Sequence, residues 1–325
     1  MTGFAELAVA SNFSFLRGAS HPWELVATAA ALGLDAVGIA DRNTLAGAVR
    51  AHVAAKEHGI RLVVGARLVL EDGFETLCLP TDRAAYGRLA RLLTRGSRRA
   101  PKGQCRLTLD DVVEFGAGQL FVVMPPYDRV DAVGPGLARL AAAFPGSAYL
   151  AATLPRRGDD RRRLARLRAL AETHGTPLVA TSDVLYHAPA RRPLQDVLTC
   201  IREHCTIDQA GFRLEVNAER HLKPADQMRR LFAGCPDAVD RSLEIAGRCR
   251  FSLDELAYEY PDEPAGESAS PQAELERLTW QGAAERLPAM TDALRATIRR
   301  ELALIAAKNY APYFLTVNDI VRFAR

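Results

Sequence analysis

The sequence predicts an α/β fold, a distorted barrel with parallel strands, followed by a helical segment. Two observations carry this prediction. Short apolar runs alternate with helical stretches through the first part of the chain, as in parallel βαβ units, and from about residue 191 the pattern turns helical. At least six strands interleaved with helices favour a closed or nearly closed barrel. A doubly wound open sheet has the same local pattern and stays open as an alternative.

The first strand is predicted over residues 4–10, on the alternation of side chains along it. It runs into a polar and aromatic turn, after which a helix begins near Pro22 and ends at Gly33. A strand over 35–40 is apolar enough to be covered on both faces. Further strands are expected at 61–70, 75–80, 119–124, 148–153 and 177–181, and helices at 44–58, 84–94, 136–144 and 160–174.

The helical part of the chain is expected at 193–203, 224–232 and 236–248. The stretch 258–271 is rich in Pro, Gly, Ser and acids and is predicted to be a linker. The chain is therefore divided into a domain over 1–257, the linker, and a region over 272–325 with helices at 272–286 and 291–308. Because Arg325 falls inside an apparent helix without a stop signal, we expect a truncated chain.

Bulk composition excludes several classes of protein. The 325 residues are 48% hydrophobic and 25% charged, with a net charge of +3 that is too small to indicate nucleic-acid binding by itself. The six cysteines form no CxxC pair, which favours free thiols in a reducing cytoplasm. No apolar run reaches the roughly 18–20 residues of a membrane span, and no export signal is seen. Phosphate-loop motifs are also absent from the sequence.

Several stretches carry a resemblance to a known family. SNFSFLRG at 11–18, GLDAVGIADRNTLAGAVRAH at 33–52 and PLVATSDVLYH at 177–187 resemble the PHP (polymerase and histidinol phosphatase) domain. Together with the segment from Arg299 to Arg325, they are similar to the error-prone branch of the C-family bacterial DNA polymerases, the translesion type. The resemblance implies a PHP barrel followed by the start of the helical region that leads into the polymerase palm.

The resemblance also implies where metal ligands would lie, and most of those residues are replaced. The His-x-His pair of metal-binding PHP domains corresponds to Ala8 and Ala10, and an acidic residue corresponds to Arg17. The later ligand patterns read Ala40-Asp41-Arg42, Gly65-Ala66-Arg67 and Asp183-Val184-Leu185. We therefore expect no catalytic, cofactor-binding or metal-binding residue in this chain.

Two carboxylates remain at these positions, Asp41 and Asp183. Since α/β barrels bring the ends of successive strands to one rim, we expect Arg17, Arg42 and Arg67 to converge on them and form ion pairs. Binding of a phosphate or other anion by the same arginines stays open. The histidines, among them His21, His52, His58, His187 and His204, show no metal-ligand spacing.

Two basic stretches stand out, residues 83–106 (Arg83 to Arg106) and 156–168 (Arg156 to Arg168). A solvated helix face is one interpretation of each, and contact with a nucleic-acid backbone or an acidic partner is the other.

The full-length relative of such a chain is expected to be a DNA-directed DNA polymerase that extends primers with deoxynucleoside triphosphates in translesion synthesis and DNA repair. That polymerase would need magnesium, DNA and accessory subunits such as a sliding clamp. It is not expected to bind a membrane. This chain alone is expected to be a structural platform without activity. Two rival hypotheses are a metal-dependent PHP phosphoesterase or 3′–5′ exonuclease, and a protein-interaction module.

Overall fold

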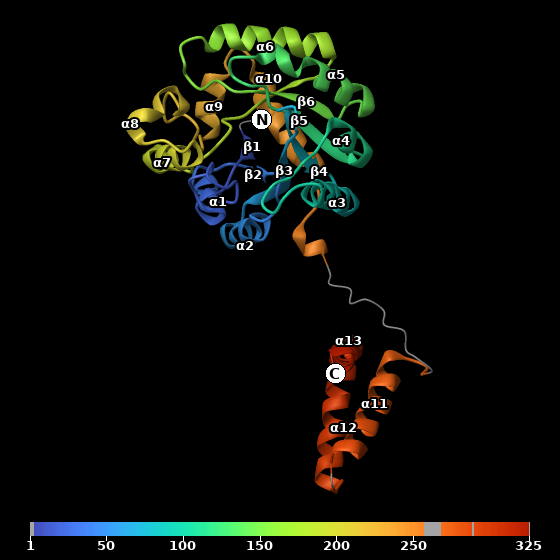
Figure 1. Ribbon diagram of the computed structural model, residues 1–325. Coiled ribbons are helices and arrows are strands. Elements are labelled where there is room, and N and C mark those ends of the chain that lie inside the picture. Colours follow the sequence, from blue (N-terminus) through green and yellow to red (C-terminus); the bar gives the residue numbers. More distant parts are fainter. Residues whose placement is uncertain (1–2, 257–267, 288, 325) are drawn as a thin grey trace. The chain divides into compact units, whose positions relative to one another are not determined.

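The computed structural model describes residues 3–256, 268–287 and 289–324. The chain divides into two compact units, Met1–Leu256 and Ala257–Arg325 (Figure 1). Most of the predicted linker 258–271 lies outside the described residues.

The first unit is built on a seven-stranded sheet whose strands follow one another in chain order. The strands are β1 (Ala5–Val9), β2 (Ala36–Arg42), β3 (Arg61–Val69), β4 (Glu75–Pro80), β5 (Gln119–Val123), β6 (Ala148–Ala152) and β7 (Leu178–Ala180). The predicted α/β class and distorted barrel are confirmed, because the strands form one curled sheet.

Strand β4 departs from the expected parallel order. It pairs antiparallel with both β3 and β5, whereas the β1–β2, β2–β3, β5–β6 and β6–β7 pairs are parallel. Only residues 70–74 separate β3 from β4, too short a connection for the crossover that a parallel pair requires. A hairpin is therefore the only solution at this point in the chain.

The two edge strands of the sheet come together through the chain that follows β7. Val9 and Val184 form a parallel bridge, in which the Ala10 N–H donates to the Val184 carbonyl at 2.9 Å and the Val184 N–H donates to the Ala8 carbonyl at 2.8 Å. Helix α10 (Pro236–Arg248) also contacts both β1 and β7. The sheet thus curls into an incompletely closed barrel.

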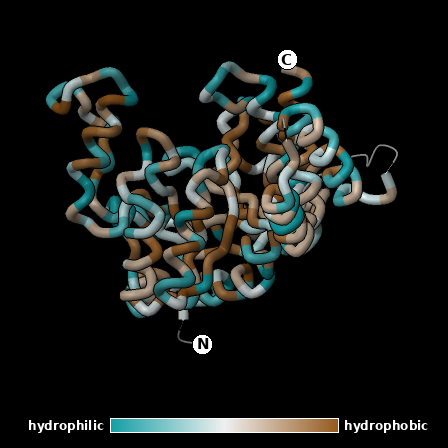
Figure 2. Tube along the Cα trace, turned by 90° about the horizontal axis from the view of Figure 1, so that it is seen from below, coloured by the Kyte–Doolittle hydropathy of each residue, from teal (hydrophilic) through white to brown (hydrophobic). Residues whose placement is uncertain are grey.

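Apolar clusters cover both faces of this sheet. One face packs against the surrounding helices through residues such as Leu25, Leu89 and Leu167. The other encloses Ile245 and Ala246 of α10. The strands are buried on both sides, as their continuous apolar runs predict, and the apolar core segments are brown in Figure 2.

The helices around the sheet are α1 (Pro22–Ala31), α2 (Ala48–His58), α3 (Arg83–Arg98), α4 (Leu109–Phe115), α5 (Gly134–Ala143) and α6 (Asp160–His174) (Figure 1). After β7 come α7 (Arg192–Arg202), α8 (Ile207–Ala210) and α9 (Ala225–Leu231), with short 3₁₀ turns at Val130–Val133, Pro189–Arg191, Gly211–Arg213 and Leu253–Glu255. The sequence did not predict α4. Helix α2 begins at Ala48, four residues after its expected start, because residues 43–47 form the connection after β2.

The described residues of the second unit form three helices, α11 (Pro271–Arg286), α12 (Asp292–Ala307) and α13 (Ala311–Ala324). Its small core is made of Leu275, Leu302, Ala311 and Leu315. Ser270 and Thr291 cap α11 and α12 by accepting hydrogen bonds from the main chain of the first turn.

Candidate functional site

The site at which the resemblance places metal ligands lies at the rim of the barrel, beside β1, β2, β3 and the chain after β7. A cavity of about 220 Å³ opens there, and its lining includes Ala10, Arg17, Arg42, Arg67 and Asp183. The predicted convergence of the three arginines on one cavity is therefore what the structure has, with Asp183 among them. Asp41 is the exception and does not line the cavity.

The pairing of β2 with β3 brings two of these arginines together. Arg42 and Arg67 are register partners at the ends of the two parallel strands. Both lie within their strands and not after them, because β2 continues through Asp41 to Arg42. Neighbouring strands lie about 4.8 Å apart, so the two guanidinium groups share one patch of the rim.

The carboxylates that balance these arginines form an alternating chain of ion pairs. Glu75 on β4 accepts from Arg67 Nε at 2.6 Å and from Arg42 Nη1 at 3.0 Å. Asp183 then accepts from Arg67 Nη1 at 2.6 Å and from Arg220 Nη2 at 2.6 Å. Arg220 also donates to Glu215, at 2.7 Å. The prediction that Arg67 pairs with Asp183 is confirmed.

The expectation that Arg42 pairs with Asp183 or Asp41 is wrong, because Glu75 is its partner. Glu75 sits at the start of β4, directly after the hairpin that reverses the chain, and so faces the end of β3. Sequence reasoning missed Glu75, Glu215 and Arg220. The antiparallel hairpin at 70–74 could have signalled Glu75, but Arg220 and Glu215 lie in an irregular segment that carries no periodic signal.

Asp183 is held in its charged form. Burial alone would raise the pKa of Asp183, but Arg220 and Arg67 outweigh burial and bring the pKa below its usual range. Its backbone has φ 48°, in the left-handed region that asparagine and aspartate tolerate better than other side chains. The side chain is 18% exposed, so these ion pairs are mostly desolvated.

Among the residues that the structure describes, Asp41 has no arginine partner, which corrects the ion-pair expectation for this residue. It is 1% exposed and accepts hydrogen bonds from the Ser11 N–H, the Ser11 hydroxyl and the Ser14 hydroxyl, each at 2.7 Å. Burial raises the pKa of Asp41, and the hydrogen bonds from Ser14 and Ser11 offset this only in part. Asp41 therefore anchors the turn after β1.

That turn, residues 11–18, places Arg17 at the cavity. The Ser14 carbonyl accepts from the N–H groups of Arg17 and Gly18, at 2.9 and 3.2 Å. A Cβ at Gly18 would lie 2.1 Å from the Ser11 carbonyl oxygen, so the turn can close only with glycine at this position. The SNFSFLRG stretch thus forms the tight turn that places Arg17 at the cavity.

Arg17 itself is half-buried, and its guanidinium group has no hydrogen bond or ion pair to the residues that the structure describes. Burial, followed by the positive charges of Arg42 and Arg202, lowers the pKa of Arg17 to about 10. Within the described part of the chain, the Arg17 guanidinium therefore lines the site without a carboxylate paired to it.

The residues present do not fit a multi-metal centre. Ala8, Ala10 and Leu185 are apolar and buried where the resemblance places histidines, and Ala10 and Leu185 pack in one small cluster with Tyr186. The remaining carboxylates are committed to hydroxyl groups or to guanidinium groups. Within residues 3–256, 268–287 and 289–324, no three His, Cys, Asp or Glu side chains are arranged to hold a metal ion.

A further buried carboxylate, Glu6 on β1, was also missed. It is fully buried and accepts from the Thr181 hydroxyl and from the Ser182 N–H at 2.8 Å. Burial raises the pKa of Glu6. This carboxylate connects β1 to the end of β7, and so helps to close the barrel.

The two basic stretches serve mostly as local structure. In the first, Arg95 pairs with Glu114 and Arg99 with Asp111, on the outside of α3 and α4. In the second, Arg163 is 4% exposed and donates to the carbonyls of residues 125–127 and 153. At this position the helix face is therefore buried and not solvated. Whether the exposed arginines of either stretch contact DNA stays a prediction.

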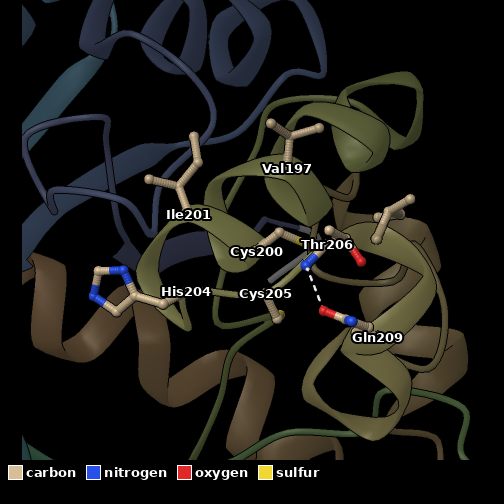
Figure 3. Close-up of a pocket in the computed structure, with 8 residues that line it drawn as sticks. Val197, Cys200, Ile201, His204, Cys205, Thr206 and Gln209 are labelled. Carbon is tan, nitrogen blue, oxygen red and sulfur yellow. Dashed lines mark hydrogen bonds between the residues drawn. The ribbon is translucent and has the colours of Figure 1, made fainter.

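A second cavity lies between α7 and α8 and is mainly apolar. Its volume is about 460 Å³, and its lining includes Val197, Cys200, Ile201 and Cys205. Figure 3 shows the His204 ring directed away from the two cysteines, so these side chains do not converge as metal ligands would.

Comparison with known proteins identifies two family models along the chain. Residues 6–130 match the PHP domain, and residues 273–325 match the bacterial DNA polymerase III alpha NTPase domain. Two solved structures also resemble part of the chain. They are an amidohydrolase from Chromobacterium violaceum with bound SO4 and no metal (TM-score 0.44, 18% identity, 57% of this chain and 88% of that one) and a lesion-specific endonuclease from Pyrococcus furiosus (TM-score 0.41, 12% identity, 57% and 48%).

Curated relatives match almost the whole chain. An error-prone DNA polymerase of Rhodopseudomonas palustris is 53% identical over 99% of this chain and 30% of its own length. That of Caulobacter vibrioides is 52% identical over 99% and 30%, and error-prone DNA polymerase 1 of Agrobacterium fabrum is 49% identical over 99% and 30%. The chain spans about 30% of the length of these relatives. The chain thus combines a match to the PHP domain, a match to the DNA polymerase III alpha domain, and about 50% identity to error-prone DNA polymerases over this part of their length.

Proposed function

We propose that this chain is part of an error-prone DNA polymerase and forms the platform on which the polymerase region rests. The observation that supports this most strongly is the identity of about half of all residues with the curated relatives over 99% of the chain. The whole protein would extend a primer with deoxynucleoside triphosphates, using magnesium, in translesion synthesis and DNA repair. Its partners would be DNA and a sliding clamp, and it would be located in the cytoplasm.

We also propose the division of labour within the chain. Residues 1–257 are the degenerate PHP domain, 258–271 the linker and 272–325 the start of the polymerase region. The ion pairs at the barrel rim support a structural role for the first domain, because guanidinium groups stand where cations would bind. None of the helices in the described residues is long and apolar enough to cross a membrane.

A domain replacement tests the proposal. In the Rhodopseudomonas palustris relative, the portion that this chain matches is replaced by this chain, and extension of a primed template is measured. We expect the chimera to extend the primer, and this chain alone neither to extend it nor to degrade a single strand from its 3′ end. A folded chimera without extension would contradict the proposal, and 3′ degradation by the chain alone that is lost in Asp41→Asn would support the exonuclease hypothesis.

Metal content is the second test. Because the positions of metal ligands carry Ala, Arg and Leu, purified chain should contain far less than one zinc or manganese ion per molecule by elemental analysis. A stoichiometric metal ion that stays bound through gel filtration would contradict the interpretation of the barrel rim as a structural ion-pair site.

A further inference from the structure

The cavity at the barrel rim has more positive than negative charge. Five guanidinium groups line it, and only three carboxylates do, so the lining carries a net charge of +2. The arginines are Arg17, Arg42, Arg67, Arg202 and Arg220, and the carboxylates are Glu75, Asp183 and Glu215. An excess of this size in a partly desolvated cavity favours a bound anion.

The excess positive charge comes from Arg17 and Arg202. The three carboxylates are engaged by Arg42, Arg67 and Arg220, as described above. Arg202 on α7 donates from Nη1 to the Leu16 carbonyl at 2.8 Å and from Nε to Glu203, which lies outside the lining, at 3.0 Å. The Arg17 guanidinium has no partner in the described part of the chain, so its N–H groups remain available at the cavity.

Arg17 lies in a positively charged environment that a bound anion would neutralise. The positive charges of Arg42 and Arg202, together with burial, lower the pKa of Arg17, while Glu75 acts in the opposite direction. A bound oxyanion would add a negative charge beside Arg17 and accept hydrogen bonds from several guanidinium groups. Such charge-assisted hydrogen bonds are stronger than those between neutral groups.

A buried neutral side chain adds to the site. Gln195 on α7 lines the cavity and is 3% exposed, and its Oε1 has no hydrogen-bond partner while its Nε2 lies 2.9 Å from the Thr199 hydroxyl. Because Oε1 itself has almost no exposed surface, Gln195 adds an enclosed, neutral side chain to the lining and no charge.

The dimensions suit a small anionic group. A volume of about 220 Å³ is below the roughly 300–1,000 Å³ of sites for drug-sized ligands. A neighbouring cavity of about 390 Å³ shares Arg67, Arg220 and the three carboxylates and adds Arg129, Arg157 and Arg163. The remainder of a larger phosphorylated ligand could extend in that direction.

We propose that Arg17, Arg42 and Arg202 bind the phosphate group of a ligand at the rim of the barrel directly, without a metal ion. This inference goes beyond the proposed polymerase function and does not depend on it. Two sources share the chemistry, a free phosphate compound such as pyrophosphate and the phosphates of a DNA strand.

The test is a thermal melt of the chain in a chloride buffer with EDTA, with added pyrophosphate or with an oligothymidylate. A ligand that binds only the folded state raises the melting temperature. Arg17→Met removes the unpaired guanidinium without breaking an ion pair, so its melting temperature without phosphate should equal or exceed that of the parent. Arg91→Met, on the exposed face of α3, is the matched control.

We expect pyrophosphate to raise the melting temperature of the parent and of Arg91→Met, and the apparent dissociation constant to increase at least tenfold in Arg17→Met. An Arg17-dependent shift with the oligothymidylate as well would identify the phosphates of a strand as the source, whereas a shift with pyrophosphate alone would identify a free phosphate compound. Equal shifts in parent and Arg17→Met, no shift with either probe, or a shift that appears only when EDTA is omitted would each overturn the proposal.

Discussion

Asp183 is the centre of the ion-pair chain, and Asp183→Asn tests whether that chain stabilises the barrel. The substitution keeps the shape of the side chain and removes its charge. Of its two partners, Arg67 and Arg220, one would then face an amide N–H in place of a carboxylate oxygen, donor against donor. The three side chains are only 17–21% exposed, so water replaces the lost contacts poorly.

The magnitude follows from this burial. Breaking a fully buried pair by removing one partner costs about 3–5 kcal/mol, and the residual exposure lowers the expected loss to about 2–4 kcal/mol of unfolding free energy. For a unit of this size that corresponds to a decrease in melting temperature on the order of 5–15 °C. Asp183→Ala should lose about 1–2 kcal/mol more, because alanine tolerates φ 48° less well than asparagine.

The pH dependence has a definite sign. Because the pKa of Asp183 is lower in the folded state, its stabilisation is fully present above the unfolded value of about 3.9 and disappears as the pH falls through the folded pKa. The difference between parent and Asp183→Asn should therefore be constant from neutral pH down to roughly pH 4 and should decrease below it.

Urea unfolding and thermal melts measure both effects. Asp226→Asn is the matched control, since it neutralises an exposed aspartate that pairs with Arg230 one helical turn away, and its melting temperature should equal that of the parent. If Asp183→Asn also melted with the parent, Arg67, Asp183 and Arg220 would be solvated and independent. The ion-pair account of the rim would then be wrong.

Two further substitutions examine the turn after β1. Gly18→Ala should lower the free energy of unfolding by on the order of 1–3 kcal/mol, because its Cβ would collide with the Ser11 carbonyl; a melt identical to the parent would mean that the turn relaxes freely. In Asp41→Asn the sign of the pH effect is opposite to that of Asp183. Because the pKa of Asp41 is raised in the folded state, the parent gains stability relative to this variant as the pH falls through the folded pKa. The unfolding free energy of the parent minus that of Asp41→Asn, measured in urea, should therefore increase on acidification. A difference that is independent of pH would contradict this.

Much of the candidate site could be foreseen from strand ends alone. The carboxyl ends of neighbouring parallel strands meet at one rim, so the positions of Arg42, Arg67 and Asp183 implied proximity before any side chain was placed. The resemblance to the PHP domain likewise implied the replacement of ligands at Ala8 and Ala10. The partners of the arginines were not readable in the same way.

The sequence by itself determined the α/β class, the order of most elements and the residues at the ends of the first three strands, since apolar periodicity and residue identity are local properties. Only the tertiary structure decided which charges pair. The antiparallel β4 places Glu75 between Arg42 and Arg67, and an irregular segment brings Arg220 to Asp183 across 37 positions of sequence. The turn at 11–18 brings two serine hydroxyls to Asp41, and it leaves the Arg17 guanidinium without a partner among the described residues. Ion pairing depends on distances of a few ångströms between segments remote in sequence, and no local pattern encodes those distances.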